Sequence, residues 1–217
     1  MRTAAIVPVN ILSAAKSRLA AHLSPTDRRD LVFWMGNHVL ASLKASGMVE
    51  EVAVVSPDQE VLRWGEERGV VPLYQADGGL NSGLQLGRVW ARSQGADALL
   101  VLLGDLPCLI PDEVAEFVRR GTERAIVLAP DRFERGTNGL LVQLSLDLPF
   151  AFGEGSLERY RSLAEQAGET PDIYRAPGMA FDVDSFADLS MLYEFGIWMP
   201  EDRDELSLPA GSTPGGV

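Results

Sequence analysis

Short apolar runs alternate with segments of helical character through the first half of the chain. The apolar runs at 4–9, 52–55, 70–73 and 98–103 are each followed by a polar loop and then by a longer segment. Such alternation with short connections is typical of a parallel β-sheet with helices on both faces. Ligands bind such sheets outside the carboxyl ends of the strands, so the loops that follow strands are the first candidates for a site.

Helix-start signals strengthen this interpretation. Ser24 and Pro25, with Asp27 three residues after the serine, combine a capping residue with a proline at the first helical position. Ser56 and Pro57 repeat the pattern and predict a second helix ending near Gly69. The remaining elements are predicted as a helix entered at 78–82 and ending near 94, a helix at 112–120, strands at 125–129 and 139–143, a helix from 156 to 167, a short strand before Phe181 and a last helix opened by Ser185 and Asp188. We therefore expect an α/β fold with a parallel sheet and helices on both faces.

The charge and cysteine content of the chain argue against some classes of function. Nineteen basic residues against thirty-one acidic ones give a net charge of −12, which argues against a general nucleic-acid binder. A small anionic substrate stays open, because local cations or a bound metal can outweigh the overall field. No apolar run approaches the length of a membrane span. The single cysteine, Cys108, allows no internal disulfide and suits a reducing cytoplasm.

The chain reads as one domain with a short tail. Residues 1–200 carry the periodic elements, and 217 residues allow one large core. Residues 201–217 are rich in Glu, Asp, Ser, Pro and Gly, with little to bury, and are predicted to be a mobile tail.

The first loop, from Pro8 to Arg18, places Lys16 and Arg18 just after the first strand. A loop in this place can present backbone amides and cations to phosphates. It lacks the glycines and the Gly-Lys-Ser/Thr step of a P-loop. A solvated loop with two surface cations is the competing interpretation.

Three aspartates could form a second functional group. Asp105 follows the most apolar strand, which places it by geometry at the ligand edge of the sheet. Asp182 and Asp184 are two residues apart, so both carboxylates share one face if the stretch is extended. Carboxylates in such positions commonly hold divalent cations. The competing interpretation for Asp182 and Asp184 is a solvated pair beside the Ser185 cap.

Two polar loops form a third group. Residues 135–138 and 152–156 are small, polar and hydroxyl-bearing, and the second loop opens a helix whose amides could hold a carboxylate or a phosphate. Ordinary turn chemistry is the alternative. Cys108 has no nearby cysteine or histidine in the sequence, which argues against a thiol nucleophile.

Taken in order, these segments resemble the CofC/FbiD family, the phospholactate or phosphoenolpyruvate guanylyltransferases of coenzyme F-420 biosynthesis. The resemblance spans about residues 4–195 and rests on six segments in register: Val7-Pro8-Val9 with Ala15 to Leu19, Gly79-Leu80-Asn81, Gly104-Asp105-Leu106-Pro107, Gly136-Thr137-Asn138, Phe152-Gly153 with Gly155-Ser156, and Asp182-Val183-Asp184 with Asp188-Leu189.

The resemblance implies a single-domain, Rossmann-like nucleotidyltransferase fold of the GT-A, MobA-like type, with a mostly parallel, mixed sheet and helices on both faces. It also implies transfer of GMP from GTP to a small phosphorylated acid, with release of pyrophosphate. The implied roles are Mg²⁺ binding by Asp105, Asp182 and Asp184, nucleotide binding by Pro8, Lys16, Arg18 and Asn81, and acid binding by Thr137, Gly153 and Ser156. Asp105, Lys16 and Arg18 would be the catalytic residues, and a homodimer is the default assembly.

Two departures from the family pattern matter. Asn10 stands where many relatives carry a lysine, and Tyr160 stands where a histidine is frequent. Three alternatives stay open: a catalytically silent nucleotide-binding module, which Asn10 favours; a related transferase that uses CTP or another acceptor such as 3-phosphoglycerate; and a phosphatase-like hydrolase at Asp105.

Overall fold

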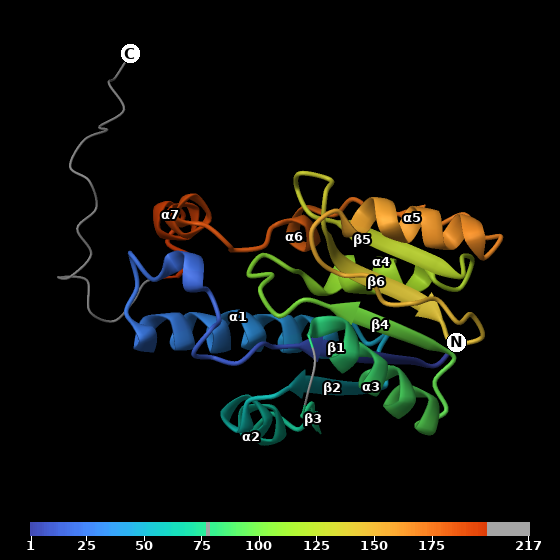
Figure 1. The fold of residues 1–217 in the computed structure, drawn as a ribbon, viewed down its shortest axis with the longest axis horizontal. Helices are drawn as coiled ribbons and strands as arrows, with labels where there is room; N and C mark the ends of the chain where they lie inside the picture. The colour runs from blue at the N-terminus through green and yellow to red at the C-terminus, as the bar shows by residue number, and fades with distance from the viewer. Residues whose placement is uncertain (77–78, 199–217) are drawn as a thin grey trace, which may run out of the picture.

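The computed structural model describes residues 1–76 and 79–198, and the predicted tail at 201–217 lies outside them. The described chain forms one seven-stranded sheet in the order β3-β2-β1-β4-β6-β5-β7 (Figure 1). The strands are β1 (Thr3–Pro8), β2 (Glu51–Ser56), β3 (Val71–Tyr74), β4 (Ala98–Leu102), β5 (Ile126–Pro130), β6 (Thr137–Gln143) and β7 (Asp172–Ile173).

One strand runs against the others. Strands β1 to β4 are mutually parallel where they pair, β6 is antiparallel to both β4 and β5, and β7 is parallel to β5. The predicted mixed, mostly parallel sheet is confirmed. Because β6 is reversed, its first residue, Thr137, lies at the edge of the sheet where β4 ends. The reversal therefore brings the segment after β4, with Asp105, next to the start of β6.

The helices follow the predicted order. They are η1 (Ser17–Leu19), α1 (Pro25–Ala45), α2 (Gln59–Glu67), α3 (Leu80–Ser93), α4 (Pro111–Arg120), α5 (Ser156–Gln166), α6 (Pro177–Ala180) and α7 (Phe186–Glu194). Capping boxes at Ser24 with Asp27 and at Ser185 with Asp188 confirm two of the predicted starts.

One local prediction was wrong. Helix α2 is capped by Asp58, whose side chain accepts a hydrogen bond from the Glu60 amide, so it begins after the Ser56–Pro57 step. Ser56 instead ends β2. The short strand expected before Phe181 is β7, and the helix α6 lies between this strand and Phe181.

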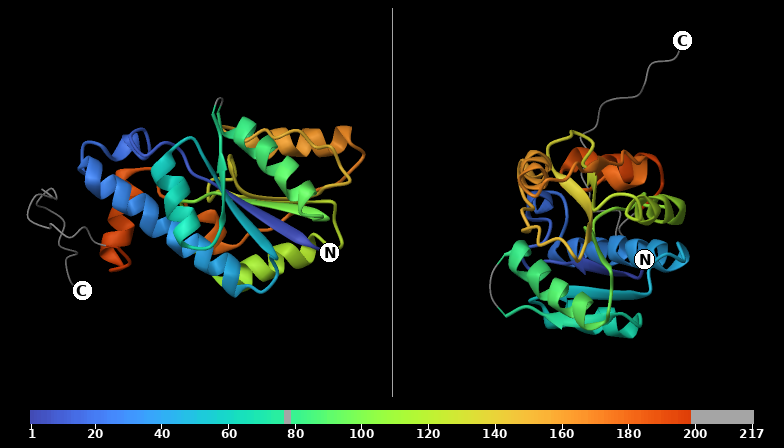
Figure 2. Two further views of the ribbon diagram at one scale, coloured as in Figure 1. Left: turned by 90° about the horizontal axis from the view of Figure 1, so that it is seen from below. Right: turned by 90° about the vertical axis from the view of Figure 1, so that its right-hand side faces the viewer.

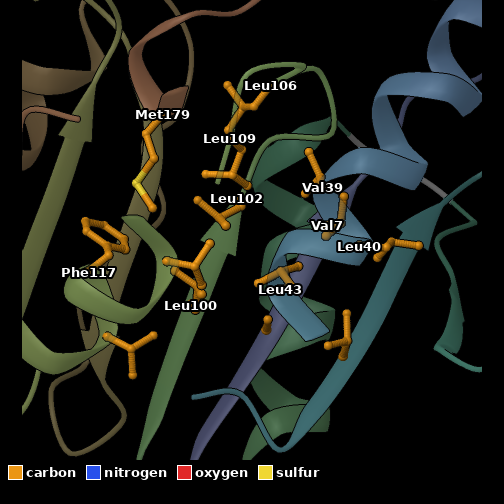
Figure 3. Packing of buried hydrophobic residues seen from close by; sticks show 14 of the residues in the cluster. Val7, Val39, Leu40, Leu43, Leu100, Leu102, Leu106, Leu109, Phe117 and Met179 are labelled. Carbon is orange, nitrogen blue, oxygen red and sulfur yellow. The ribbon is translucent and has the colours of Figure 1, made fainter. Parts of the chain in front are cut away.

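Alternating strand residues divide the core into two layers. Odd residues of β1 and even residues of β4 pack against α1, α2, α4 and α6, whereas the intervening residues pack against α3 and α5. Figure 2 shows helices on both sides of the sheet. Figure 3 shows Val39 and Leu43 of α1 facing Val7 and Leu100 on the first of these layers. The strands are apolar at nearly every position, and successive side chains point to opposite faces of the sheet, which accounts for both layers.

A third cluster lies at the carboxyl edge of the sheet. It joins η1, the start of α1 and α7 through Leu19, Leu31, Val183 and Leu189, all fully buried. In Figure 1, α7 stands beside the amino-terminal part of α1, away from the strands. This packing holds the loop that carries Lys16 against the segment that carries Asp184.

Candidate active site

A cleft of about 420 Å³ opens at the carboxyl ends of the strands. It lies between the loops that follow β1 and β4, where the crossover connections diverge to either side, which is the expected ligand position in such a sheet. Its walls are formed by Pro8, Val9, Asn10, Ala14, Ala15, Lys16, Ser17, Arg18, Val32, Met35, Pro57, Gln75, Gly79, Leu80, Leu103, Gly104, Asp105 and Asp184. The predicted first loop, Pro8 to Arg18, therefore supplies much of the lining.

Lys16 lies at the centre of this site. Its Nζ donates to Asp105 Oδ2 at 2.6 Å and to Asp184 Oδ1 at 3.0 Å. Burial alone would lower the pKa of the Lys16 ammonium, but the charges of Asp105 and Asp184 outweigh burial and raise it above its ordinary value. The side chain is therefore a protonated cation held between two carboxylates.

The rest of the first loop is more exposed. Arg18 places its guanidinium 3.6 Å from Asp184 Oδ2, with 78% of its side chain exposed, so it can move toward a ligand at little cost. The Asn10 carboxamide oxygen accepts from the Ile11 amide at 2.8 Å while the residue lines the cleft. Lys16 and Arg18 thus place two cations in the cleft, where they balance the charges of Asp105 and Asp184.

Asp182 lies between the cleft residues and the polar loops. Its Oδ1 accepts a hydrogen bond from Asn138 Nδ2 at 3.2 Å. Burial, and then the charge of Asp105, raise the pKa of Asp182 above its ordinary value; Asp184 adds to the effect, and the Asn138 bond partly offsets it. The three predicted aspartates therefore interact electrostatically, and a cation would relieve their repulsion.

The residues that hold these aspartates were absent from the predicted site. Asn138 is buried next to Thr137 and also donates to the Met179 carbonyl at 3.0 Å. Asp188 is buried, and its Oδ2 accepts from the Asp184 amide at 2.9 Å. Both lie within segments that carry the family resemblance, and this position was the one sequence feature that could have pointed to them as site residues.

The aspartates suit a divalent cation that is completed by its substrate. Among residues 1–76 and 79–198, no group of three or more His, Cys, Asp or Glu side chains is arranged to hold a metal alone. Mg²⁺ is usually held by one or two carboxylates together with substrate phosphates. Asp105 Oδ1 is buried and has no hydrogen-bond partner in the described chain. Such an oxygen is a suitable ligand for a hard cation.

The two polar loops meet beside this acidic group. The Leu157 amide donates to the Arg135 carbonyl at 3.3 Å, which joins the start of α5 to the loop before β6. The hydroxyls of Thr137 and Ser156 are both buried and have no partner within the described residues. Gly153 adopts a φ of 117°, which favours glycine. The structure thus brings the loops of the predicted acid-binding residues together.

Asn81 and Tyr160 bond to the loop before Gly153 and are not among the described residues that line the cleft. Asn81 is not among the described residues that line it, and its Oδ1 accepts from the Phe152 amide at 2.9 Å. Tyr160 is fully buried, and its hydroxyl accepts from the Ala151 amide at 3.0 Å. Both side chains hold the loop that leads to Gly153.

Comparison with known proteins agrees with this geometry. A family model described as "Guanylyl transferase CofC like" matches residues 3–197. The chain belongs to this family. The match includes every element of the site, from the loop after β1 to α7, and confirms the resemblance drawn from the sequence.

Several curated relatives carry the same activity name. A phosphoenolpyruvate guanylyltransferase of Sphaerobacter thermophilus is 46% identical over 192 residues, covering 88% of this chain and 93% of the relative. A protein of the same name from Rubrobacter xylanophilus is 40% identical over 197 residues, covering 90% and 96%. This CofC-like chain is therefore similar to guanylyltransferases over nearly their whole length.

Solved structures confirm the fold. A putative nucleotide-diphospho-sugar transferase from Desulfovibrio desulfuricans G20 aligns with a TM-score of 0.73 at 14% identity, covering 90% of this chain and 88% of the other. A nucleotidyl transferase from Methanothermobacter thermautotroptrophicus aligns at 0.65 and 16% identity, covering 89% and 97%. The CofC-like chain has the nucleotidyltransferase fold. None of the helices in its described part is long and apolar enough to cross a membrane.

Proposed function

We propose that this CofC-like guanylyltransferase transfers GMP from GTP to phosphoenolpyruvate, with 2-phospholactate as the alternative acceptor, and releases pyrophosphate. One observation carries the proposal: cations and carboxylates meet at the cleft, and two unpaired hydroxyls lie beyond Asp182. The proposal therefore assigns the triphosphate to the cleft and the small acid to the polar loops beside it. The names of the relatives favour phosphoenolpyruvate as that acid.

The reaction needs no general base from the protein. A phosphate monoester is largely dianionic at neutral pH, since its second pKa is near 6. One phosphate oxygen of the acid attacks the α-phosphorus of GTP, the new P–O bond forms, and the bond to the β-phosphate oxygen breaks as pyrophosphate leaves. The main barrier is repulsion between two polyanions, and the site must reduce it.

Lys16 and Arg18 are proposed to bind the triphosphate. In the structure Lys16 is paired with Asp105 and Asp184, so a bound nucleotide would have to draw the ammonium away from them. The aspartates are then free for a metal ion. Asp105, Asp182 and Asp184 would hold Mg²⁺ together with phosphate oxygens, and the ion would supply Lewis-acid stabilisation of charge on the transferring phosphoryl group.

Thr137, Gly153 and Ser156 are proposed to bind the acid. The buried hydroxyls of Thr137 and Ser156 have no hydrogen-bond partner among the described residues. Because a buried hydroxyl without a partner costs free energy, a ligand that accepts hydrogen bonds from both would be stabilised here. Ser156 is the first residue of α5, where the helix dipole favours an anion. A substrate carboxylate would satisfy both groups and leave its phosphate directed toward Asp182 and the cleft.

Pyrophosphate release tests the proposal. Purified protein with Mg²⁺ would be given GTP, CTP or ATP with phosphoenolpyruvate, 2-phospholactate or 3-phosphoglycerate in turn. We expect release only when GTP and phosphoenolpyruvate or 2-phospholactate are both present, and loss of at least about 100-fold in Asp105→Asn, in line with the loss of one charge-stabilising group. Release with CTP or 3-phosphoglycerate would reassign the donor or acceptor. GTP binding without release would instead support the silent module.

A further inference from the structure

Asn81 ties the wall of the nucleotide cleft to the loop that precedes Gly153. Its Oδ1 accepts from the Phe152 amide at 2.9 Å, and its Nδ2 donates to the Phe152 carbonyl at 3.3 Å. Both bonds join residues 71 positions apart in sequence. We propose that Asn81 is a positioning residue for the acid-binding loop and not a nucleotide ligand.

The Asn81 carboxamide bonds through both its oxygen and its nitrogen to the backbone of a single residue, Phe152. Asn81 lies in the first turn of α3, directly after Gly79 and Leu80, which line the cleft. Helix α3 packs on β1 through Leu84, which is fully buried with Ile6 in the same layer. The anchor is therefore rigid, and the loop at 151–155 is the partner that it restrains.

A second group holds the loop from the opposite side. The Tyr160 hydroxyl accepts from the Ala151 amide at 3.0 Å, and its ring meets Phe152 edge-on with centroids 5.4 Å apart. Arg159 donates to the Ala151 carbonyl at 3.0 Å and 3.2 Å. Asn81 and Tyr160 thus fix the two residues before Gly153, Ala151 and Phe152, and the backbone conformation of Gly153 sets where Ser156 stands.

This inference rests on the proposed function, because it assumes that Gly153 and Ser156 bind the acid. A residue that only positions this loop affects the acid and leaves GTP binding unchanged. A nucleotide ligand would do the reverse. A residue that matters only for stability would lower the active fraction, and so kcat, without raising either KM.

Bisubstrate kinetics of Asn81→Ala separate these roles. We expect the KM for phosphoenolpyruvate to rise about five- to tenfold, the size expected for one or two lost neutral hydrogen bonds. The KM for GTP, the Kd for GTP from titration and kcat at saturating acid should stay within about twofold. Gln85→Ala is the matched control, because Gln85 is exposed one turn along the same helix. It should change none of these quantities.

Two further measurements keep the test decisive. Tyr160→Phe retains the ring packing, removes the acceptor for the Ala151 amide and should raise the same KM selectively. Amide hydrogen exchange at Phe152 should be at least about fivefold faster in Asn81→Ala, whether or not the enzyme turns over. A raised KM for GTP, or unchanged exchange at Phe152, would overturn the positioning role. Absence of turnover in the wild type would instead overturn the proposed function.

Discussion

At the scale of single residues, Lys16 has the most constrained role. It adopts a φ of 50°, uncommon for a residue with a side chain, and places its ammonium between two carboxylates. One side chain thus pairs with two of the three aspartates before any ligand arrives, and its single charge offsets one of their two. The account gives Lys16 two alternative partners, the aspartates or a triphosphate, and this exchange has a measurable consequence.

Replacing Lys16 by methionine should strengthen divalent-metal binding in the absence of nucleotide. Without the ammonium, Asp105 and Asp184 lose their counter-charge. A divalent cation can then form the favourable electrostatic interactions that Lys16 forms in the wild type. We expect the Kd for Mn²⁺, measured by electron paramagnetic resonance, to fall at least about tenfold, since hydrogen bonds to charged groups contribute about 1.5–3 kcal/mol. GTP should bind more weakly to the same variant.

Arg18→Met is the control for this experiment. Arg18 lies 3.6 Å from Asp184 and is largely exposed, so its loss should change the Mn²⁺ Kd less than the loss of Lys16. Equal Mn²⁺ affinity in the wild type and in Lys16→Met would contradict the exchange of partners.

The sequence predicted individual site residues better than their contacts. Lys16, Asp105 and Asp184 were all expected near a ligand because each follows a strand or belongs to a motif. Their mutual pairing could not be predicted, because it depends on the left-handed backbone at Lys16 and on packing between η1 and α7. For the same reason the hydrogen bonds between the Asn81 side chain and Phe152 could not be predicted.

At the scale of elements, the start of α7 holds the acidic segment in place. The Asp188 carboxylate accepts from the amides of Asp184 and Ser185 and pairs with Arg132. Burial alone would raise the pKa of Asp188, but these hydrogen bonds outweigh burial and lower it below its ordinary value. The helix cap therefore also fixes the backbone that carries Asp184.

This carboxylate should make stability depend on acid pH. Because the pKa of Asp188 is lower in the folded protein, its ionised form stabilises the fold above about pH 4 and that contribution is lost as pH falls toward the folded pKa. At pH 7, Asp188→Asn should lower the free energy of unfolding by about 1–3 kcal/mol. Denaturant titrations should show this difference shrinking below about pH 4, whereas a constant difference would contradict the assignment.

Element boundaries show what local sequence can and cannot decide. The Ser24 and Ser185 caps were predicted correctly because a capping box is a local interaction. The start of α2 was misplaced because Asp58 competes with Ser56 for the same role, and Ser56 is retained by β2. The antiparallel direction of β6, which brings Thr137 to the active edge, depends on pairing with β4 and β5 and has no local signal.

At the scale of the whole molecule, the sheet order explains how an acidic protein can bind two anions. The chain carries a net charge of −12, yet Lys16 and Arg18 are gathered at the carboxyl edge between β1 and β4. The reversed β6 brings the unpaired Thr137 hydroxyl to the same edge. The parallel part of the sheet was predictable from the alternation of elements, whereas the reversal of β6 and this convergence depend on the full topology.

Identification of the reaction product tests the central claim most directly. Protein, Mg²⁺, GTP and phosphoenolpyruvate would be incubated together, and the products followed by phosphorus NMR and mass spectrometry. The account predicts one compound containing guanosine and the acid joined through two coupled phosphorus atoms, formed in equal amount with pyrophosphate. Formation of GMP or inorganic phosphate, with no compound that contains both guanosine and the acid, would contradict the account and indicate hydrolysis instead.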